Sequence, residues 1–425
     1  MVPHCITTGV VAALVAVTPL LAQGPEQTDT LLTRLTREAL ASNLGLARVT
    51  AQARAAAARV RPAGALPDPT LTLGAMDLVL PGFAIKRSDF TEFDVEASQE
   101  FPWPGTLGAR SRAAAADAEG RQADVAVQQR DIIARTGSIY HRLRYLITAR
   151  ETLRQQIALV ERSVEIATTR YASGAVPQTD PLDARVARGR MNAEGAMLAA
   201  EEARLRASLQ AIRGATRPES LLVRGIDPQS VRSLYATLAA HPHGGVAELE
   251  QHPVLAARRA AIKAADETAI AEGLDARPDV AIMARYGART IASDFFSTSI
   301  GLRIPLWARH KQKQLAEAAR HEADAGRAAL AEDRSALVAE YQATLAEAEA
   351  GLARLGILLD DVLPSADAAR DAALRSYQVG KIDFQTLLSS TDAVYRARLE
   401  AAQVAAQHLI HLAMLQQLTG PEDAQ

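Results

Sequence analysis

The sequence predicts a mainly α-helical protein with membrane-inserted β-strands, built from two copies of one strand-strand-long-helix plan. Three observations lead to this fold class. Landmark residues recur at a fixed offset, two stretches of about seventy residues carry apolar side chains at helical spacing, and four short segments alternate between apolar and polar residues. A period near 3.6 marks an α-helix and a period of two marks a β-strand.

The internal repeat is the most informative of these features. Three residues recur 206 positions later in the same order: Tyr171, Gly174 and Gly214 as Tyr377, Gly380 and Gly420. Two proline-containing pairs also match: Pro67-Asp68 with Pro278-Asp279, and Phe101-Pro102 with Ile304-Pro305. Such matched order indicates a duplication, so both halves should fold alike. We expect a first repeat at 30–216, a linker or equatorial region at 217–250, a second repeat at 251–420 and a tail at 421–425.

Each repeat should begin with a short helix that a proline ends, at about Thr30–Arg61 in the first half and His252–Ala276 in the second. Long helices follow the strands, from Gly105 to Tyr171 and from Trp307 to Tyr377. At about 1.5 Å per residue each would approach 100 Å. We expect a bend or interruption in the second one near Pro364.

After a turn, each long helix is followed by a helix of about thirty-five residues that ends at Gly214 or Gly420. This returning helix covers only half the length of its partner. The short helix before the strands can cover the other half if the two stack end to end. That arrangement would build the wall of a tube.

The four alternating segments each have an apolar and a polar face. The apolar positions are Leu71, Leu73, Ala75, Phe93, Val95, Ala97, Phe101, Val280, Ile282, Ala284, Tyr286, Phe296, Ile300, Leu302 and Ile304. Four strands cannot close a membrane barrel, because known single-chain barrels start at about eight. A homotrimer would supply twelve. The polar face would then line a lumen with Asp94, Glu96, Glu100, Arg285 and Arg303.

The N-terminal residues 1–22 are expected to be a secretory signal peptide, with an apolar run from Val10 to Val17 and cleavage near Ala22. The single cysteine, Cys5, precedes that run, so we expect neither disulfides nor thiolate metal sites in the mature chain. After residue 22 no run reaches the roughly 18 consecutive apolar residues of a membrane-spanning helix. The net charge of −2 offers no basic surface for nucleic acid.

The duplicated plan, the FPWPGTLGAR segment at 101–110 and the YASG and YQVG turns at 171–174 and 377–380 resemble the TolC-like outer-membrane efflux protein family, including its heavy-metal, RND-associated branch. The resemblance covers about residues 30–420. It implies a trimeric 12-stranded outer-membrane β-barrel continued by a long periplasmic α-helical barrel, in a Gram-negative bacterium. Its implied partners are a periplasmic adaptor (membrane fusion) protein, an inner-membrane transporter of the RND type and outer-membrane lipid.

The same resemblance assigns roles to the turns between the long and returning helices. They would be the periplasmic tips, with adaptor-docking residues Tyr171, Gly174, Tyr377 and Gly380. Both glycines suit a positive φ at a helix end. Acids just beyond the tips would form a gate: Asp180, Asp183 and Asp383. Thr386 and Ser389 stand where the second copy would carry acids, which departs from the family pattern, and helix N-terminal stabilisation is the alternative role.

We therefore expect a passive conduit for small molecules or metal ions, without cofactor or catalysis. The sequence contains no nucleophile elbow, phosphate-binding loop, zinc-protease helix or catalytic cysteine. His241, His243 and His252 fit a linker better than a metal site. Two alternatives stay open, namely a soluble periplasmic coiled-coil scaffold or adaptor and the outer-membrane duct of a type I protein secretion system.

Overall fold

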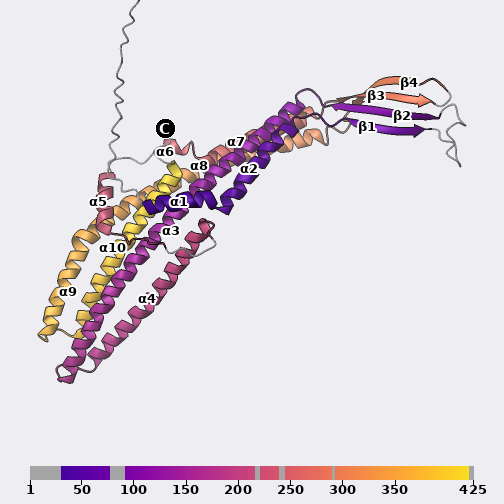
Figure 1. Ribbon diagram of the computed structural model, residues 1–425. Helices are drawn as coiled ribbons and strands as arrows, with labels where there is room; N and C mark the ends of the chain where they lie inside the picture. The colour runs from indigo at the N-terminus through magenta and orange to yellow at the C-terminus, as the bar shows by residue number, and fades with distance from the viewer. Residues whose placement is uncertain (1–29, 77–90, 216–220, 239–244, 290–291, 421–425) are drawn as a thin grey trace, which may run out of the picture.

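The computed structural model describes residues 30–76, 91–215, 221–238, 245–289 and 292–420. The expected signal peptide and C-terminal tail lie outside these ranges. The molecule is elongated, with a bundle of long helices at one end and a four-stranded sheet at the other (Figure 1). Among the described residues, none of the helices combines the length and the apolar character needed to cross a bilayer.

The helices of the first repeat are α1 (Thr30–Ser42), α2 (Leu44–Ala63), α3 (Thr106–Ala172) and α4 (Thr179–Ile212). The long α3 and the shorter α4 confirm the sequence prediction. The prediction of a single short helix at Thr30–Arg61 was wrong, because the helix is divided in two at Asn43. Asn43 has an extended backbone, and its side chain accepts a hydrogen bond from the backbone N–H of Leu46 at 3.0 Å. Asparagine is a strong N-cap for this reason and starts a new helix here.

The helices of the second repeat are α7 (Pro253–Leu274), α8 (Gln312–Ile357), α9 (Leu363–Gln378) and α10 (Phe384–Thr419). A five-residue π-helix, η1 (Leu358–Val362), separates α8 from α9 directly before Pro364. This confirms the expected interruption, because proline has no backbone N–H to continue the helical ladder. The start of α8 lies five residues later than predicted, because a series of turns follows Trp307.

The described part of the predicted linker contains two short helices, α5 (Pro228–Leu238) and α6 (Val246–Leu249). Ile226 and Val231 pack into an apolar cluster with residues of α8, η1 and α10. Arg232 adds a bidentate pair with Asp360 of η1, at 2.6 and 2.7 Å. Helix α5 is therefore packed against the second repeat, whereas Leu221 and Val223 before it pack against the first.

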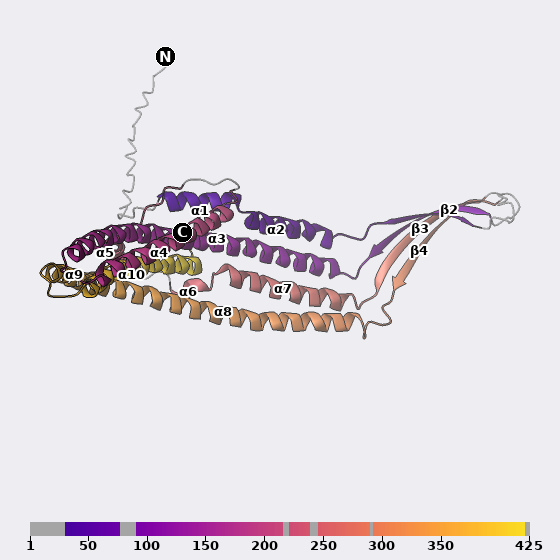
Figure 2. The ribbon, with the colours of Figure 1, turned by 90° about the horizontal axis from the view of Figure 1, so that it is seen from below.

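The short helices stack end to end with the returning helices, as expected. The side-chain amide of Asn43 donates to the carbonyl of Ile212 at the end of α4, at 2.8 Å. Gly214 has φ +62, and a Cβ there would lie 2.5 Å from the carbonyl oxygen of Ser42, so only glycine fits. In the second repeat Arg130 donates to the last carbonyls of α10, where His252 caps α7. Figure 2 shows α2, α3, α7 and α8 side by side in one curved layer.

The sheet contains β1 (Thr70–Met76), β2 (Glu92–Phe101), β3 (Asp279–Arg289) and β4 (Phe295–Arg303), all antiparallel in the order β1-β2-β3-β4. These are the four strands predicted from alternation. The two repeats meet at the β2–β3 pair. The outer edges belong to β1 and β4, so one protomer provides an open sheet.

Candidate functional sites on the sheet and at the helical tips

One face of the sheet is apolar and exposed. The register places Leu71 opposite Ala97, Val95 opposite Tyr286 and Ile282 opposite Ile300, so the apolar positions of all four strands share one side. Leu71 is 68% exposed and Ile300 is 74% exposed. A soluble sheet would bury such a face, whereas a membrane barrel turns it toward lipid.

The opposite face is charged and internally paired. It carries the five predicted lumen residues. At one level, Arg285 lies 2.9 Å from Glu92 and 3.3 Å from Asp94, and Arg289 lies 3.7 Å from Glu92. Glu92 and Asp94 are both buried, so their charges require these cations. Sequence analysis missed Glu92 and Arg289, although both continue the alternation of their strands.

A second charged cluster joins the sheet to the helices. Arg303 at the end of β4 lies 2.8 Å from Glu100 and 3.1 Å from Asp279, measured between side-chain nitrogen and carboxylate oxygen. Asp279 is buried and also accepts a hydrogen bond from the backbone N–H of Trp103 at 2.8 Å. Three strand ends from both repeats therefore meet at the carboxylate of Asp279, which the sequence analysis named only as a matched position of the repeat.

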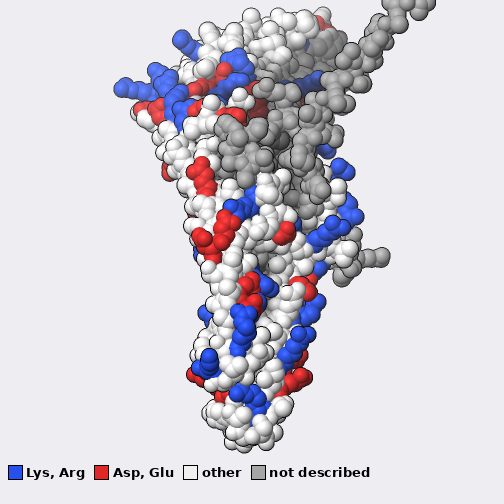
Figure 3. Space-filling view, turned by 90° about the vertical axis from the view of Figure 1, so that its left-hand side faces the viewer, with Lys and Arg blue, Asp and Glu red and all other residues white. Residues whose placement is uncertain are grey.

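The two helical tips have the same turn. Gly174 and Gly380 have φ values of +75 and +72, which confirms the predicted positive φ. Of the residues expected to dock an adaptor, Tyr171 is exposed, whereas Tyr377 is only 2% exposed and packs against Phe384. The apex at the lower end of the molecule consists of uncharged residues on the face that Figure 3 displays.

Tyr377 connects the two helical hairpins. Its hydroxyl donates to Asp180 in the first turn of α4 at 3.4 Å, and Asp180 is 9% exposed. The guanidinium group of Arg170, near the end of α3, donates to the Tyr377 carbonyl at 2.8 Å and lies 4.8 Å from the centre of its ring. Burial and the charge of Asp180 raise the pKa of Tyr377, so the hydroxyl keeps its proton and remains a donor.

The three predicted gate acids occupy different environments within one protomer. Asp180 faces inward to Tyr377, whereas Asp183 is exposed one turn further along α4. Asp383 is the N-cap of α10, and its carboxylate accepts from the backbone N–H of Thr386 at 2.8 Å. These hydrogen bonds to Thr386 hold the pKa of Asp383 below its ordinary value. The protomer alone does not bring the three acids together.

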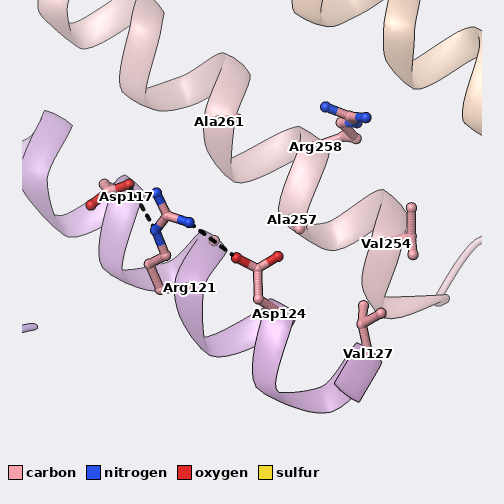
Figure 4. A pocket seen from close by; sticks show the side chains of 9 residues that line it. Asp117, Arg121, Asp124, Val127, Val254, Ala257, Arg258 and Ala261 are labelled. Carbon is pink, nitrogen blue, oxygen red and sulfur yellow. Dashed lines mark hydrogen bonds and ion pairs between the residues drawn. The ribbon is translucent and has the colours of Figure 1, made fainter. Parts of the chain in front are cut away.

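A shallow groove of about 380 Å³ lies between α3 and α7. Figure 4 shows Arg121 between Asp117 and Asp124, and Arg258 on the opposite helix. Arg258 pairs with Asp333 of α8 at 2.6 Å. Each charged side chain that lines this groove is thus paired within the described part of the chain, either inside the groove or with Asp333, so none is free for a ligand.

In the described part of the chain, no three histidine, cysteine or acidic residues are grouped to hold a metal ion. Of the three histidines noted in the sequence, His252 caps α7 with its ring nitrogen, at 3.3 Å from the backbone nitrogen of Val254. His241 and His243 lie outside the described residues.

Comparisons with known proteins agree with this architecture. A family model described as outer membrane efflux protein matches residues 35–215 and 246–421. The outer-membrane channel OprN is similar, with a TM-score of 0.80, 21% identity and coverage of 92% of this chain and 91% of OprN. CusC aligns with a TM-score of 0.77 at 15% identity, covering 93% of each chain. VceC from Vibrio cholerae gives 0.78 at 18% identity, covering 92% and 96%. No curated protein sequence matches this chain.

Proposed function

Because this chain belongs to the outer membrane efflux protein family and is an outer-membrane channel subunit of an efflux system, we propose that it exports small molecules or metal ions passively and has no catalytic role. Channels of this family are trimers that extend from the outer membrane into the periplasm. They work with a periplasmic adaptor and an inner-membrane pump. The observation that carries the proposal is the sheet with one exposed apolar face and one ionised face.

The open edges of the sheet support closure by oligomerisation. Three protomers that pair β4 with a neighbouring β1 would form a twelve-stranded barrel, and no backbone edge would remain unpaired in lipid. The charged face would then line the lumen. The described strands carry five acids and three arginines on that face, a net charge of −2 per protomer and −6 per trimer. Such a lumen should favour cations over anions.

The tip residues support a gate at the periplasmic end. Opening the tip requires the α3–α4 hairpin to move away from the α9–α10 hairpin, which would break the contact between Tyr377 and Asp180. Asp183 is exposed one helical turn beyond Asp180 in α4, and its carboxylate would repel the Asp183 carboxylates of the other two protomers around the threefold axis. We propose Asp180, Asp183 and Asp383 as the gate. Adaptor docking would use the exposed Tyr171 and the two glycine turns, with Tyr377 supporting them from beneath.

The cargo is proposed from chemistry alone. A small net negative charge in the lumen favours both metal cations and cationic small molecules, and it does not discriminate between these two classes of cargo. The duct of a protein secretion system would share this wall. RND-type pumps are the proposed inner-membrane partner because the FPWPG segment resembles that branch of the family. A soluble scaffold does not fit, because it would leave the apolar face of four strands in water.

Membrane fractionation followed by electrophoresis without heating tests this function. The expected result is a trimer in the outer-membrane fraction that becomes a monomer on heating and conducts ions in planar bilayers. The variant Arg285→Lys is a control for the conductance measurement, because it keeps the net charge of the lumen. A periplasmic monomer that extracts without detergent would overturn the proposal.

A further inference from the structure

We propose that the turn between β4 and α8 binds the headgroups of anionic phospholipids in the periplasmic leaflet of the outer membrane. This interaction surface is defined by Trp307, Arg309, Lys311 and Lys313. It goes beyond the transport function, because it concerns how the channel is held in its membrane and which lipids surround it.

The turn is ordered and displays its cations to the outside. The backbone N–H of His310 donates to the Trp307 carbonyl at 3.0 Å, and that of Lys313 donates to the Ala308 carbonyl at 2.9 Å. The side chains of Arg309, Lys311 and Lys313 are all exposed. None of these three forms an ion pair with any residue in the described ranges. Three cations within five residues therefore lack an internal counter-charge.

The cations continue the lipid-facing surface of the strand. Leu302 and Ile304 lie on the apolar face, and Leu306 and Trp307 follow with 79% and 75% of their surfaces exposed. An apolar strand followed by tryptophan and then by Arg and Lys is the order expected across a membrane interface. The helices descend from this end of the strand, so the surface lies on the periplasmic side (Figure 1).

The first repeat has the same layout but neutralises its own cations. Trp103 is followed by Arg110, which pairs with Asp275 of α7 at 2.6 Å, and by Arg112, which pairs with Glu267 at 2.9 Å. In the second repeat the first turn of α8 contains no acid, and the positive end of the helix dipole adds to the charge of Lys311. At the corresponding turn of the first repeat the cations are therefore neutralised within the chain, whereas those of the second repeat are available to an external anion.

A lipid phosphate fits better than a soluble anion. The cations are spread over an open surface, so a small free ion would remain largely hydrated and screened there. A phospholipid is held in addition by its acyl chains against the neighbouring apolar residues. Each cation close to an anionic membrane surface contributes about a five-fold preference.

The chain contains only two tryptophans, which allows a direct test. Trp103→Phe leaves Trp307 as the sole tryptophan of each protomer in the full-length trimer, and its emission is excited selectively over that of tyrosine. The trimer is reconstituted in phosphatidylcholine vesicles that contain either brominated phosphatidylglycerol or brominated phosphatidylcholine at equal mole fraction. We expect several-fold stronger quenching of Trp307 by the anionic lipid. The triple variant R309Q/K311Q/K313Q should bring the ratio of the two quenching constants to about one.

Two controls keep the result interpretable. The variant R185Q/R188Q/R190Q removes the same charge from exposed positions on α4 at the far end of the helices and should retain the excess quenching. Raising the ionic strength should remove the excess in the protein with unchanged cations, which tests the surface even if the triple variant does not assemble. Equal quenching by both lipids, excess retained in the triple variant, or loss of the excess when soluble glycerol phosphate replaces chloride at constant ionic strength would each overturn the proposal.

Discussion

Removing the hydroxyl group of Tyr377 should make the periplasmic tip open more often. The variant Tyr377→Phe removes the hydroxyl group that donates to Asp180. The aromatic ring remains in its buried position, and the Arg170 guanidinium group keeps its bond to the backbone carbonyl and its place over the ring. The change therefore separates the link between the hairpins from the packing of the tip.

The expected magnitude follows from the geometry. A distance of 3.4 Å is long for a hydroxyl–carboxylate bond, so we assign it about 1 kcal/mol, near the middle of the range for a net intramolecular hydrogen bond. One such bond per protomer changes the opening equilibrium about five-fold. If three protomers open together, the loss of about 3 kcal/mol corresponds to an increase of about 150-fold.

Single-channel recording of the purified trimer in a planar bilayer measures the open probability directly. Arg170→Ala should open the tip further than Tyr377→Phe, because it removes both the backbone hydrogen bond and the cation–π contact. Tyr395→Phe is the matched control, because it deletes a Tyr–carboxylate bond of 2.9 Å between Tyr395 of α10 and Glu194 of α4, which joins the same two hairpins further from the tip.

An open probability of Tyr377→Phe equal to that of the unmodified trimer, with assembly intact, would refute the reasoning. Equal opening in Tyr377→Phe and Tyr395→Phe would also refute it, because the effect would then be a general loosening of the hairpins and not a gate at the tip.

Three further predictions concern the sheet and the helix junction. Leu71→Arg should cost about 2–4 kcal/mol on the lipid face and reduce the yield of trimer on unheated gels, whereas Thr72→Arg on the polar face of the same strand should assemble normally. Arg285→Gln should leave Glu92 and Asp94 without their shared cation and raise cation over anion permeability, measured as a shift in reversal potential across a salt gradient; an unchanged potential would contradict a lumenal position. Burial, with Arg130 nearby, lowers the pKa of His252 from 6.5 to about 4. Protonation therefore favours the unfolded chain, and the free energy of unfolding should fall by up to about 3 kcal/mol per protomer as the pH is lowered from 6.5 to 4. His252→Asn keeps a cap and should flatten this dependence in thermal melts, and a melting curve that responds to pH as before would count against it.

The repeat, the four strands and the long helices could all be predicted from the amino-acid sequence. The strands and helices are properties of neighbouring residues, because alternation and helical spacing are visible within ten to twenty positions. The repeat is visible because landmark residues recur in the same order along the chain. Pro364 predicted the interruption at η1. The recurrence of Gly174 as Gly380 predicted the two tip turns. The break at Asn43 was missed, because a polar residue inside an apolar pattern reads equally well as a solvated position and as a cap.

The contacts between distant charged and polar groups became visible only in the folded chain. Tyr377 and Asp180 are 197 positions apart, and Trp103 and Asp279 are 176 apart. No local pattern specifies such pairs, because they depend on the register of β2 with β3 and on the rotation of each helix about its axis. The same reason explains why Tyr377, which was expected to be accessible to an adaptor, is buried, and why Asp279 contacts groups at the ends of three strands.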